Sequence, residues 1–444
     1  MSKVLRISFL CLLSSFYFSC VSYNPEHVTS MIRYGDYDNA LLFLQESKSS
    51  YYGKTSDVLY ALDLGMLRHF SRDYENSNQE LTLAEKLIED FYSKSITQGI
   101  ASYLTNDTVI DYTGEEYEDI YSNLFKCLNY IHLGKYEDAL VEIRRFDNKQ
   151  KLLATKYSDK ISEAKLTIQS KSDFNYESIS FHNSALARYL SMLLYRSQGD
   201  YDSAQVDYNY LESAFETQEN LYDFAIPKSV DEELLVKSTD ARLNIVAFSG
   251  LSPKKEEVRF DNYYWTGNGF SPFVIAFPEM KYVSSQVGRV IVHVLNLESG
   301  EKTVCNLELL ESLEKIAYDT FREKKSLIYL KAVNRALTKY VSNTVLNAAS
   351  YVSQRNGDNT ASALFELASV FSSIYNVATE AADLRVCRFF PGKALVGGIT
   401  LEPGTYSVEV VFLTKTNEVL TRELFENMTI KPNGLNLVEA ICLK

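Results

Sequence analysis

The sequence predicts an α+β protein, with a helical N-terminal half and strands in the C-terminal half. Residues 20–240 carry apolar residues at helical spacing, interrupted by four similar turns. From about residue 241 the pattern changes to short β-branched and aromatic runs bounded by Gly, Pro and Asn. We therefore predict an α-helical repeat array, followed by a small antiparallel β-sandwich-like unit with an inserted helical hairpin.

The expected segments follow from these changes of pattern. They are a signal peptide at 1–19, a helical repeat domain at 20–240, a β region at 241–307, a helical hairpin at 308–383 and a second β region at 384–444. At 444 residues the chain is long enough for two or three hydrophobic cores. Few Pro residues and ordinary hydrophobic content argue against long disordered linkers.

The first segment has the pattern of a secretory signal. Lys3 and Arg6 precede the apolar run Ile7–Phe18, which is too short for a stable membrane span. Cys20 follows directly, as in the cleavage site of bacterial lipoproteins, where this Cys carries the lipid. The alternatives are an ordinary signal cut near Ser22 or an uncleaved anchor. Lipidation would place the chain in the bacterial cell envelope, on a membrane, facing the periplasm or at the outer membrane.

Charge and cysteine content exclude several classes of function. The formal net charge is −13, which argues against nucleic acid and against electrostatic docking on anionic lipid. Membrane attachment is therefore expected through the lipid alone. The remaining cysteines show neither a CxxC pair nor zinc-ligand spacing, so we predict no metal and no cofactor. The sequence does not decide whether Cys387 and Cys442 form a disulfide.

Four turns organise the helical half. Each has Gly or Arg, then Asp or Lys, then Tyr, with a small residue three positions later. The small residue would let two helices cross closely. The four are Gly35-Asp36-Tyr37…Ala40, Arg72-Asp73-Tyr74…Ser77, Gly134-Lys135-Tyr136…Ala139 and Gly199-Asp200-Tyr201…Ala204.

This turn, with its flanking helices, resembles the tetratricopeptide repeat (TPR). In the clearest unit, 121–146, the small first-helix position falls on Cys127 and the second-helix positions fall on Ile143 and Phe146. The tyrosines of successive turns lie 37, 62 and 65 residues apart, instead of about 34. Extra helices or loops are therefore expected between units. A helical bundle of another kind is the alternative.

Several short motifs also resemble a family of bacterial envelope lipoproteins with TPR-like repeats and no assigned activity. They are Tyr112-x-Gly114-Glu115-x-Tyr117-Glu118, Leu128-Asn129-Tyr130, Gly250–Arg259, Ala382–Arg385 and Leu401-x-Pro403-Gly404-x-Tyr406. Val386 and Cys387 stand where an aromatic residue is usual, which is a departure from the pattern. The resemblance implies an envelope location.

In the C-terminal half six strands and two helices are expected. The strands are Arg242–Phe248, Phe273–Phe277, Gly288–Leu297, Thr405–Leu413, Val419–Ile430 and Leu435–Leu443. The helices are Glu308–Gln354 and Thr360–Asp383. The second helix has few charges, so it is expected to pack against protein, with membrane contact as the alternative.

No catalytic motif is found, and we predict that the chain is not an enzyme. His69 and His132 end first helices and are expected at the surface or as caps. The acids of Asp111–Asp119 are expected to form a solvated helix start; cation binding is the alternative, although the spacing is not that of a calcium loop.

The favoured hypothesis is a lipid-anchored scaffold or adaptor that binds a protein or peptide in a concave, tyrosine-rich groove. Tyr130 and Tyr195 are expected to contact the partner. Lys254, Lys255 and Glu256 are expected to form an exposed contact loop. The alternative is a regulator or enzyme of cell-wall assembly with its site in the C-terminal β unit.

Overall fold

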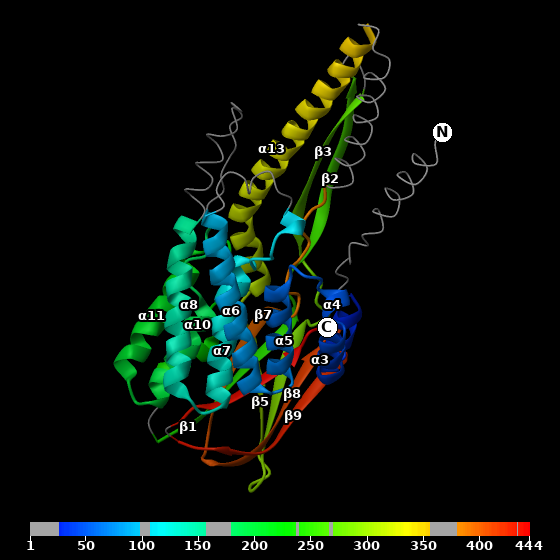
Figure 1. Ribbon diagram of the computed structural model, residues 1–444. Coiled ribbons are helices and arrows are strands. Elements are labelled where there is room, and N and C mark those ends of the chain that lie inside the picture. The colour runs from blue at the N-terminus through cyan, green and yellow to red at the C-terminus, as the bar shows by residue number, and fades with distance from the viewer. Residues whose placement is uncertain are drawn as a thin grey trace.

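The computed structural model describes residues 26–97, 107–156, 179–236, 239–265, 270–355, 380–432 and 434–444. Helices dominate the N-terminal half and sheets the C-terminal half, which confirms the predicted α+β class (Figure 1). Cys20 and the signal segment lie outside the described residues. No helix among the described residues is both long enough and apolar enough to cross a membrane.

In the described part of the N-terminal half we find four pairs of helices, and each pair is joined by a short turn. The pairs are α2 (Glu26–Arg33) with α3 (Tyr37–Glu46), α5 (Asp57–Phe70) with α6 (Tyr74–Thr97), α7 (Glu116–His132) with α8 (Tyr136–Lys156), and α10 (Ala185–Ser197) with α11 (Tyr201–Thr217). The same described residues also include the short helices α4 (Lys48–Tyr51) and α12 (Lys228–Glu232) and the 3-10 turns Asp107–Val109 and Glu233–Leu235.

The four predicted turns all join these pairs, and they share one geometry. In the third turn the Lys135 N–H donates to the Tyr130 carbonyl (2.8 Å) and the Ala139 N–H donates to the Lys135 carbonyl (3.1 Å). The same two bonds recur in the other turns. Each turn needs one residue with positive φ, and Arg72 takes this role where the others use Gly. The small residues are fully buried at Ala40, Ser77, Ala139 and Ala204.

A close helix crossing explains the glycine in the second unit. A Cβ on Gly65 of α5 would lie 2.6 Å from the Leu81 side chain of α6. No real side chain tolerates that distance, so Gly65 sets how closely these two helices approach.

Two four-stranded sheets form the body of the C-terminal half. The first has the order β10 (Asn436–Cys442), β1 (Ala241–Leu251), β7 (Pro391–Leu401), β6 (Glu308–Glu311); the second has the order β5 (Lys302–Asn306), β4 (Arg289–Asn296), β8 (Gly404–Leu413), β9 (Val419–Ile430). Alternate residues of β1 and β8, such as Ile245 and Val410, share one core. The two sheets therefore form a sandwich.

One strand pair differs from the prediction of a purely antiparallel unit. β1 and β10 are parallel, in register from Leu243 opposite Asn436 to Ser249 opposite Cys442. The reason is that β10 arrives from β9 of the other sheet instead of turning back in a hairpin from β1.

A long arm projects from this body (Figure 1). It consists of the two-stranded ribbon β2 (Lys254–Trp265) and β3 (Phe270–Lys281), packed against the helix α13 (Leu313–Arg355). Two predictions are wrong here. Lys254–Arg259 begins a strand instead of forming a loop, because the ribbon pairs it with Lys281–Ala276. Glu308–Glu311 is a strand paired with β7 before the helix begins.

The predicted second helix falls mostly on residues 356–379, outside the described part of the chain, and the residues that follow it, 380–383, are not helical. The helical hairpin of the prediction is therefore confirmed only in its first helix.

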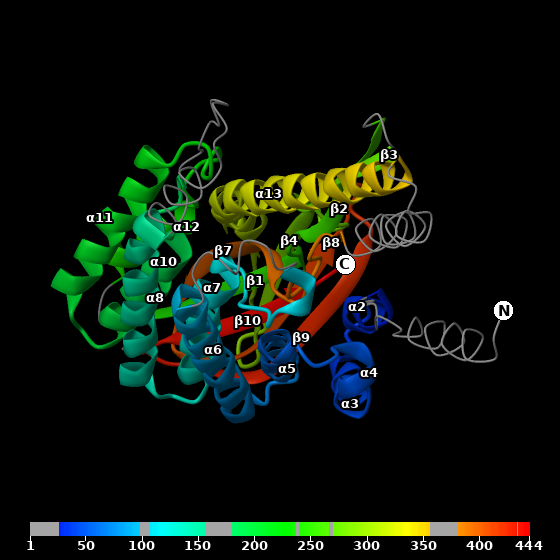
Figure 2. The same cartoon turned by 45° about the horizontal axis from the view of Figure 1, so that its top comes forward.

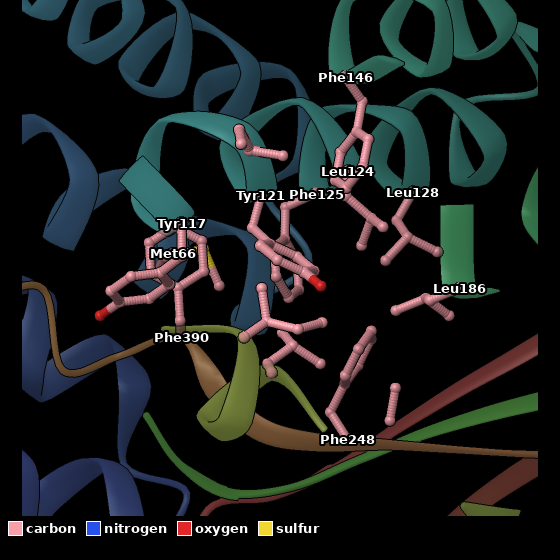
Figure 3. Packing of buried hydrophobic residues seen from close by; sticks show 14 of the residues in the cluster. Met66, Tyr117, Tyr121, Leu124, Phe125, Leu128, Phe146, Leu186, Phe248 and Phe390 are labelled. Atoms are coloured by element: carbon pink, nitrogen blue, oxygen red, sulfur yellow. The ribbon is translucent and has the colours of Figure 1, made fainter. Parts of the chain in front are cut away.

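The main core lies between the helical array and the first sheet. α5, α7 and α10 are buried on almost every side, whereas α6, α8 and α11 cover the outside of the array (Figure 2). The ring centroid of Phe125 in α7 lies 5.2 Å from that of Phe248 in β1 and 5.7 Å from that of Phe390 (Figure 3). The inner face of the helical array is therefore packed against the first sheet of the same chain.

Candidate functional site

One hollow lies outside the array, between α6, α7 and α8. We call it the outer groove, with a volume of about 600 Å³. It is lined by Glu85, Ile88, Glu89, Tyr92, Glu116, Asp119, Ile120, Arg145, Asn148, Lys149, Leu152 and Leu153. Its size is within the usual range for ligand pockets.

An ion-pair network fixes the walls of the outer groove. The Lys149 ammonium of α8 lies 2.9 Å from Glu85 of α6 and 2.6 Å from Asp119 of α7. Lys126, whose side chain is buried, adds a 2.7 Å contact to Glu85 and a 2.9 Å contact to Glu142. Burial alone would raise the pKa of Glu85, but the two ammonium groups outweigh it and hold this pKa at about 2. One anionic carboxylate therefore ties three helices together.

The rest of the lining is apolar and acidic. Ile88, Ile120 and Leu153 line the groove beside Leu152, whose side chain is 64 % exposed. Four carboxylates and two cations lie among the lining residues, so the groove has a net negative charge. Chemically, it suits an occupant with apolar side chains and a basic group.

The predicted contact tyrosines do not meet in one site. Tyr130 lines a second hollow of about 500 Å³, between α6 and the end of α7, and is half-buried. Tyr195 is half-buried against the main core on α10. Tyr195 lines neither this hollow nor the outer groove.

The predicted contact loop is also divided. Lys254 and Glu256 form an exposed ion pair (2.8 Å) at the start of β2. Lys255 points the other way and is buried: its ammonium contacts the Glu115 carboxylate (2.5 Å) and the Arg385 carbonyl (2.8 Å). The alternation of a strand separates these neighbours, which a loop would have left together.

Buried polar contacts join the inner helices to the C-terminal half, and we call them the polar seam. The acids at the start of α7 belong to it, so the expectation of a solvated helix start is wrong. Glu115 and Glu118 form a capping box that is buried because β2 and the segment before β7 cover it. The Glu118 carboxylate accepts the Tyr112 hydroxyl (2.7 Å), and burial raises the pKa of Glu118 to about 7.

Two histidines also belong to the polar seam, where the sequence predicted surface or capping positions. His69 Nε2 and His132 Nε2 each lie 2.6 Å from Glu439 of β10, on its two oxygens. His69 Nδ1 lies 2.7 Å from the Asn129 side-chain oxygen, while the Asn129 amide donates to Ser77. Both ring nitrogens of His69 therefore face acceptors, the arrangement of an imidazolium. Burial opposes this, but the Glu439 charge and both bonds raise the pKa of His69.

A third cluster surrounds Glu311 of β6. Its carboxylate accepts hydrogen bonds from the Tyr121 hydroxyl (2.5 Å), the Tyr222 hydroxyl (2.7 Å) and the Ser184 hydroxyl (2.8 Å). Burial raises the pKa of Glu311, and these donors partly offset the effect. Helices α7 and α10 are thereby attached to the edge of the first sheet.

The described contacts of the polar seam join the inner helices to the sheets and to the arm. In the described part of the chain, no group of three or more His, Cys, Asp or Glu could hold a metal ion. The four described cysteines are free thiols: Cys127, Cys305, Cys387 and Cys442. The disulfide between Cys387 and Cys442, which the sequence left undecided, is therefore not formed in this structure.

Sequence reasoning missed the outer groove and most of the seam. A sequence signal existed for one part of the seam: Glu115 and Glu118 stand three apart before an apolar run, the spacing of a capping box. For Glu439 and the two histidines no local signal exists, because about 300 to 370 residues separate them. Comparisons of the chain with protein-family models, curated proteins and solved structures found no match.

Proposed function

We propose that the chain is a lipid-anchored adaptor of the bacterial cell envelope, that its four helix pairs are TPR-like repeats, and that it binds a partner peptide in the outer groove. The groove itself supports this most: three helices with fixed ion pairs surround an apolar lining with a net negative charge. The peptide that fits has apolar side chains next to Lys or Arg. The inner face of the array is not used, because the β unit covers it.

A rigid groove favours binding over chemistry. Lys149, Glu85 and Asp119 hold each other in place, so little side-chain entropy is lost when a peptide enters. Leu152 on the rim offers apolar area to the peptide. The anchor part of the proposal rests on Cys20 and the apolar run before it.

Synthetic peptides test the groove directly. Two matched sets of fluorescent peptides would be used, with identical apolar residues and either Lys or Glu between them. Fluorescence anisotropy is expected to show binding of the Lys set alone to the full chain. Leu152→Glu should weaken it about tenfold or more, since a charge enters an apolar contact. Leu42→Glu, also an exposed Leu but on α3, is the control. Equal affinity of the two peptide sets, or no effect of Leu152→Glu, would refute the groove.

The anchor needs a separate measurement. Cys20→Ser is expected to abolish incorporation of labelled fatty acid in bacterial cells and to leave the precursor unprocessed. The control is Cys127→Ser, which changes a buried thiol and leaves the signal segment intact. Labelling that survives Cys20→Ser would rule out lipid attachment at this residue.

A further inference from the structure

The end of the arm has an unusual surface. It consists of residues 262–265 of β2, 270–278 of β3 and 340–354 of α13, and we call it the distal arm. Not one of these 28 residues is Asp, Glu, Lys or Arg, although 23 % of the whole chain is charged. At the average frequency roughly six charges would be expected there. The nearest charged residues along the chain, Asp261, Glu279, Lys339 and Arg355, lie just outside these limits.

These three pieces lie together in space. The Ser271 hydroxyl of β3 donates to the Tyr340 carbonyl of α13, and the Tyr264 ring of β2 lies 6.2 Å from the Tyr340 ring. Tyr340 is thus level with the end of the ribbon. From there α13 continues to Arg355, a further length of about 22 Å at the helical rise. Figure 1 shows this end pointing away from the body.

The distal arm also exposes large apolar side chains. Trp265, the single Trp of the chain, is 63 % exposed, and Tyr263 and Tyr264 beside it are 59 % and 50 % exposed. On α13, Val341, Val345, Tyr351 and Val352 are exposed, and so is Leu337, which lies one turn before the distal arm. Leu337, Val341, Val345 and Val352 lie within about 80° of one another around the helix, so they form one stripe.

We propose that the distal arm inserts into the interfacial region of a lipid bilayer, as a membrane contact separate from any N-terminal lipid. Trp and Tyr are enriched at this depth, where the ring is buried and its polar group stays hydrated. Charged groups are costly there, which accounts for a charge-free surface on both strands and the helix. A protein interface usually keeps charged residues on all sides of its apolar centre. Of the charged residues nearest the distal arm, Asp261, Glu279 and Lys339 lie on the side toward the body, and only Arg355 lies at the far end.

The same charge pattern defines the lipid. The distal arm itself contains no Lys or Arg, and Arg355, the next residue of α13, is a single exposed cation at its end. The contact is therefore expected to depend little on lipid charge. Binding to phosphatidylcholine, a zwitterionic lipid, is therefore expected to be the same at low and high salt. The proposal is independent of the outer groove, which lies on other helices.

Trp265 is a built-in reporter for this contact. The full chain would be mixed with phosphatidylcholine vesicles, with and without bromine on the acyl chains. Trp265 emission is expected to shift to shorter wavelength and to be quenched by the brominated lipid, equally at low and high salt. Moving the reporter with Trp265→Phe and Tyr201→Trp places it at the exposed start of α11 on the body, where no quenching is expected.

Charge substitutions supply the second arm of the test. Val345→Asp is expected to remove the quenching, whereas Val304→Asp, at an equally exposed valine of β5 on the body, should leave it unchanged. Thermal melts by circular dichroism would verify that both variants fold. An unquenched Trp265 in the unmodified chain overturns the proposal, as does quenching that survives both Val345→Asp and Val341→Asp. A blue shift without vesicles, with a doubled mass in sedimentation, would show contact with a second copy instead and equally overturn it.

Discussion

A buried carboxyl group in α5 offers the sharpest test of the fold. Asp63 is fully buried, and its Oδ2 accepts the Tyr52 hydroxyl at 2.7 Å. Burial raises the pKa of Asp63 from 3.8 to about 8, an effect that the hydrogen bonds only partly offset. Asp63→Asn replaces the carboxyl by a neutral group of the same shape. It keeps an acceptor for Tyr52, so the variant changes ionisation with little change in packing.

The magnitude follows from the two pKa values of Asp63. Between pH 3.8 and about 8 the unfolded chain releases the proton that the folded chain keeps. Stability therefore falls as pH rises, by about 1.4 kcal/mol per pH unit. The Asn side chain does not titrate, so its advantage over Asp63 grows by about 3 kcal/mol between pH 5 and pH 7. An unpaired amide N–H would subtract about 1–3 kcal/mol at every pH and leave this growth unchanged.

Urea unfolding of both proteins at pH 5 and pH 7, followed by circular dichroism, measures this growth. The exposed Asp202→Asn on α11 is the control, and its difference from the unmodified chain should be the same at both pH values. If the Asp63→Asn difference were also independent of pH, the carboxyl would be ionised in the fold and the reasoning would be refuted.

Three further predictions concern the packing and the polar seam. Gly65→Ala is expected to cost about 1–3 kcal/mol in urea unfolding, because the new methyl group would overlap Leu81. The raised pKa of His69 stabilises the fold below pH 6.5, and this contribution is lost as pH rises through the folded pKa. His69→Gln should therefore flatten the pH dependence of stability above pH 6.5. Lys255→Met should cost about 3 kcal/mol, since it removes a buried partner of Glu115.

Each of these has its own control. Adding Leu81→Ala to Gly65→Ala should give a smaller loss than the two single losses combined, and strict additivity would contradict the crossing argument. His182→Gln changes an exposed histidine and should leave the pH dependence of the unfolding free energy unchanged. If this pH dependence survived His69→Gln, other groups would be its cause. Lys254→Met, at an exposed ion pair, should be nearly neutral, and a loss as large as that of Lys255→Met would contradict the assigned burial.

Much of the local structure was predictable because it depends on neighbours in sequence. The turn at Gly134 needs a positive φ, and the small residue Ala139 needs only the next helix. The strands Val419–Ile430 and Thr405–Leu413 were predicted nearly to the residue from alternation and turn signals. Lys254–Arg259 was predicted wrongly, because charged residues in a strand need a partner strand and a cover to be stable, and both lie elsewhere in the chain.

The sequence predicted that the candidate site is a helical surface, but not where on the array it lies. Helix pairs with an exposed surface followed from the sequence, but the surface chosen for contact, with Tyr130 and Tyr195, is split between two places in the fold. The sequence could not show that α5, α7 and α10 would turn their inner faces to β1, since helix periodicity marks a face as apolar without naming what covers it. The outer groove became visible only when Lys149, Glu85 and Asp119 were found together.

The sequence by itself therefore determined the α+β class, the four turns and most strand positions, because each is a property of local pattern and composition. Only the tertiary structure decided that acids and histidines expected at the surface are buried in the polar seam, and that β10 runs parallel to β1. It also decided which apolar residues remain exposed on the arm. These outcomes depend on contacts between residues hundreds of positions apart, such as His69 with Glu439, and no local pattern encodes them.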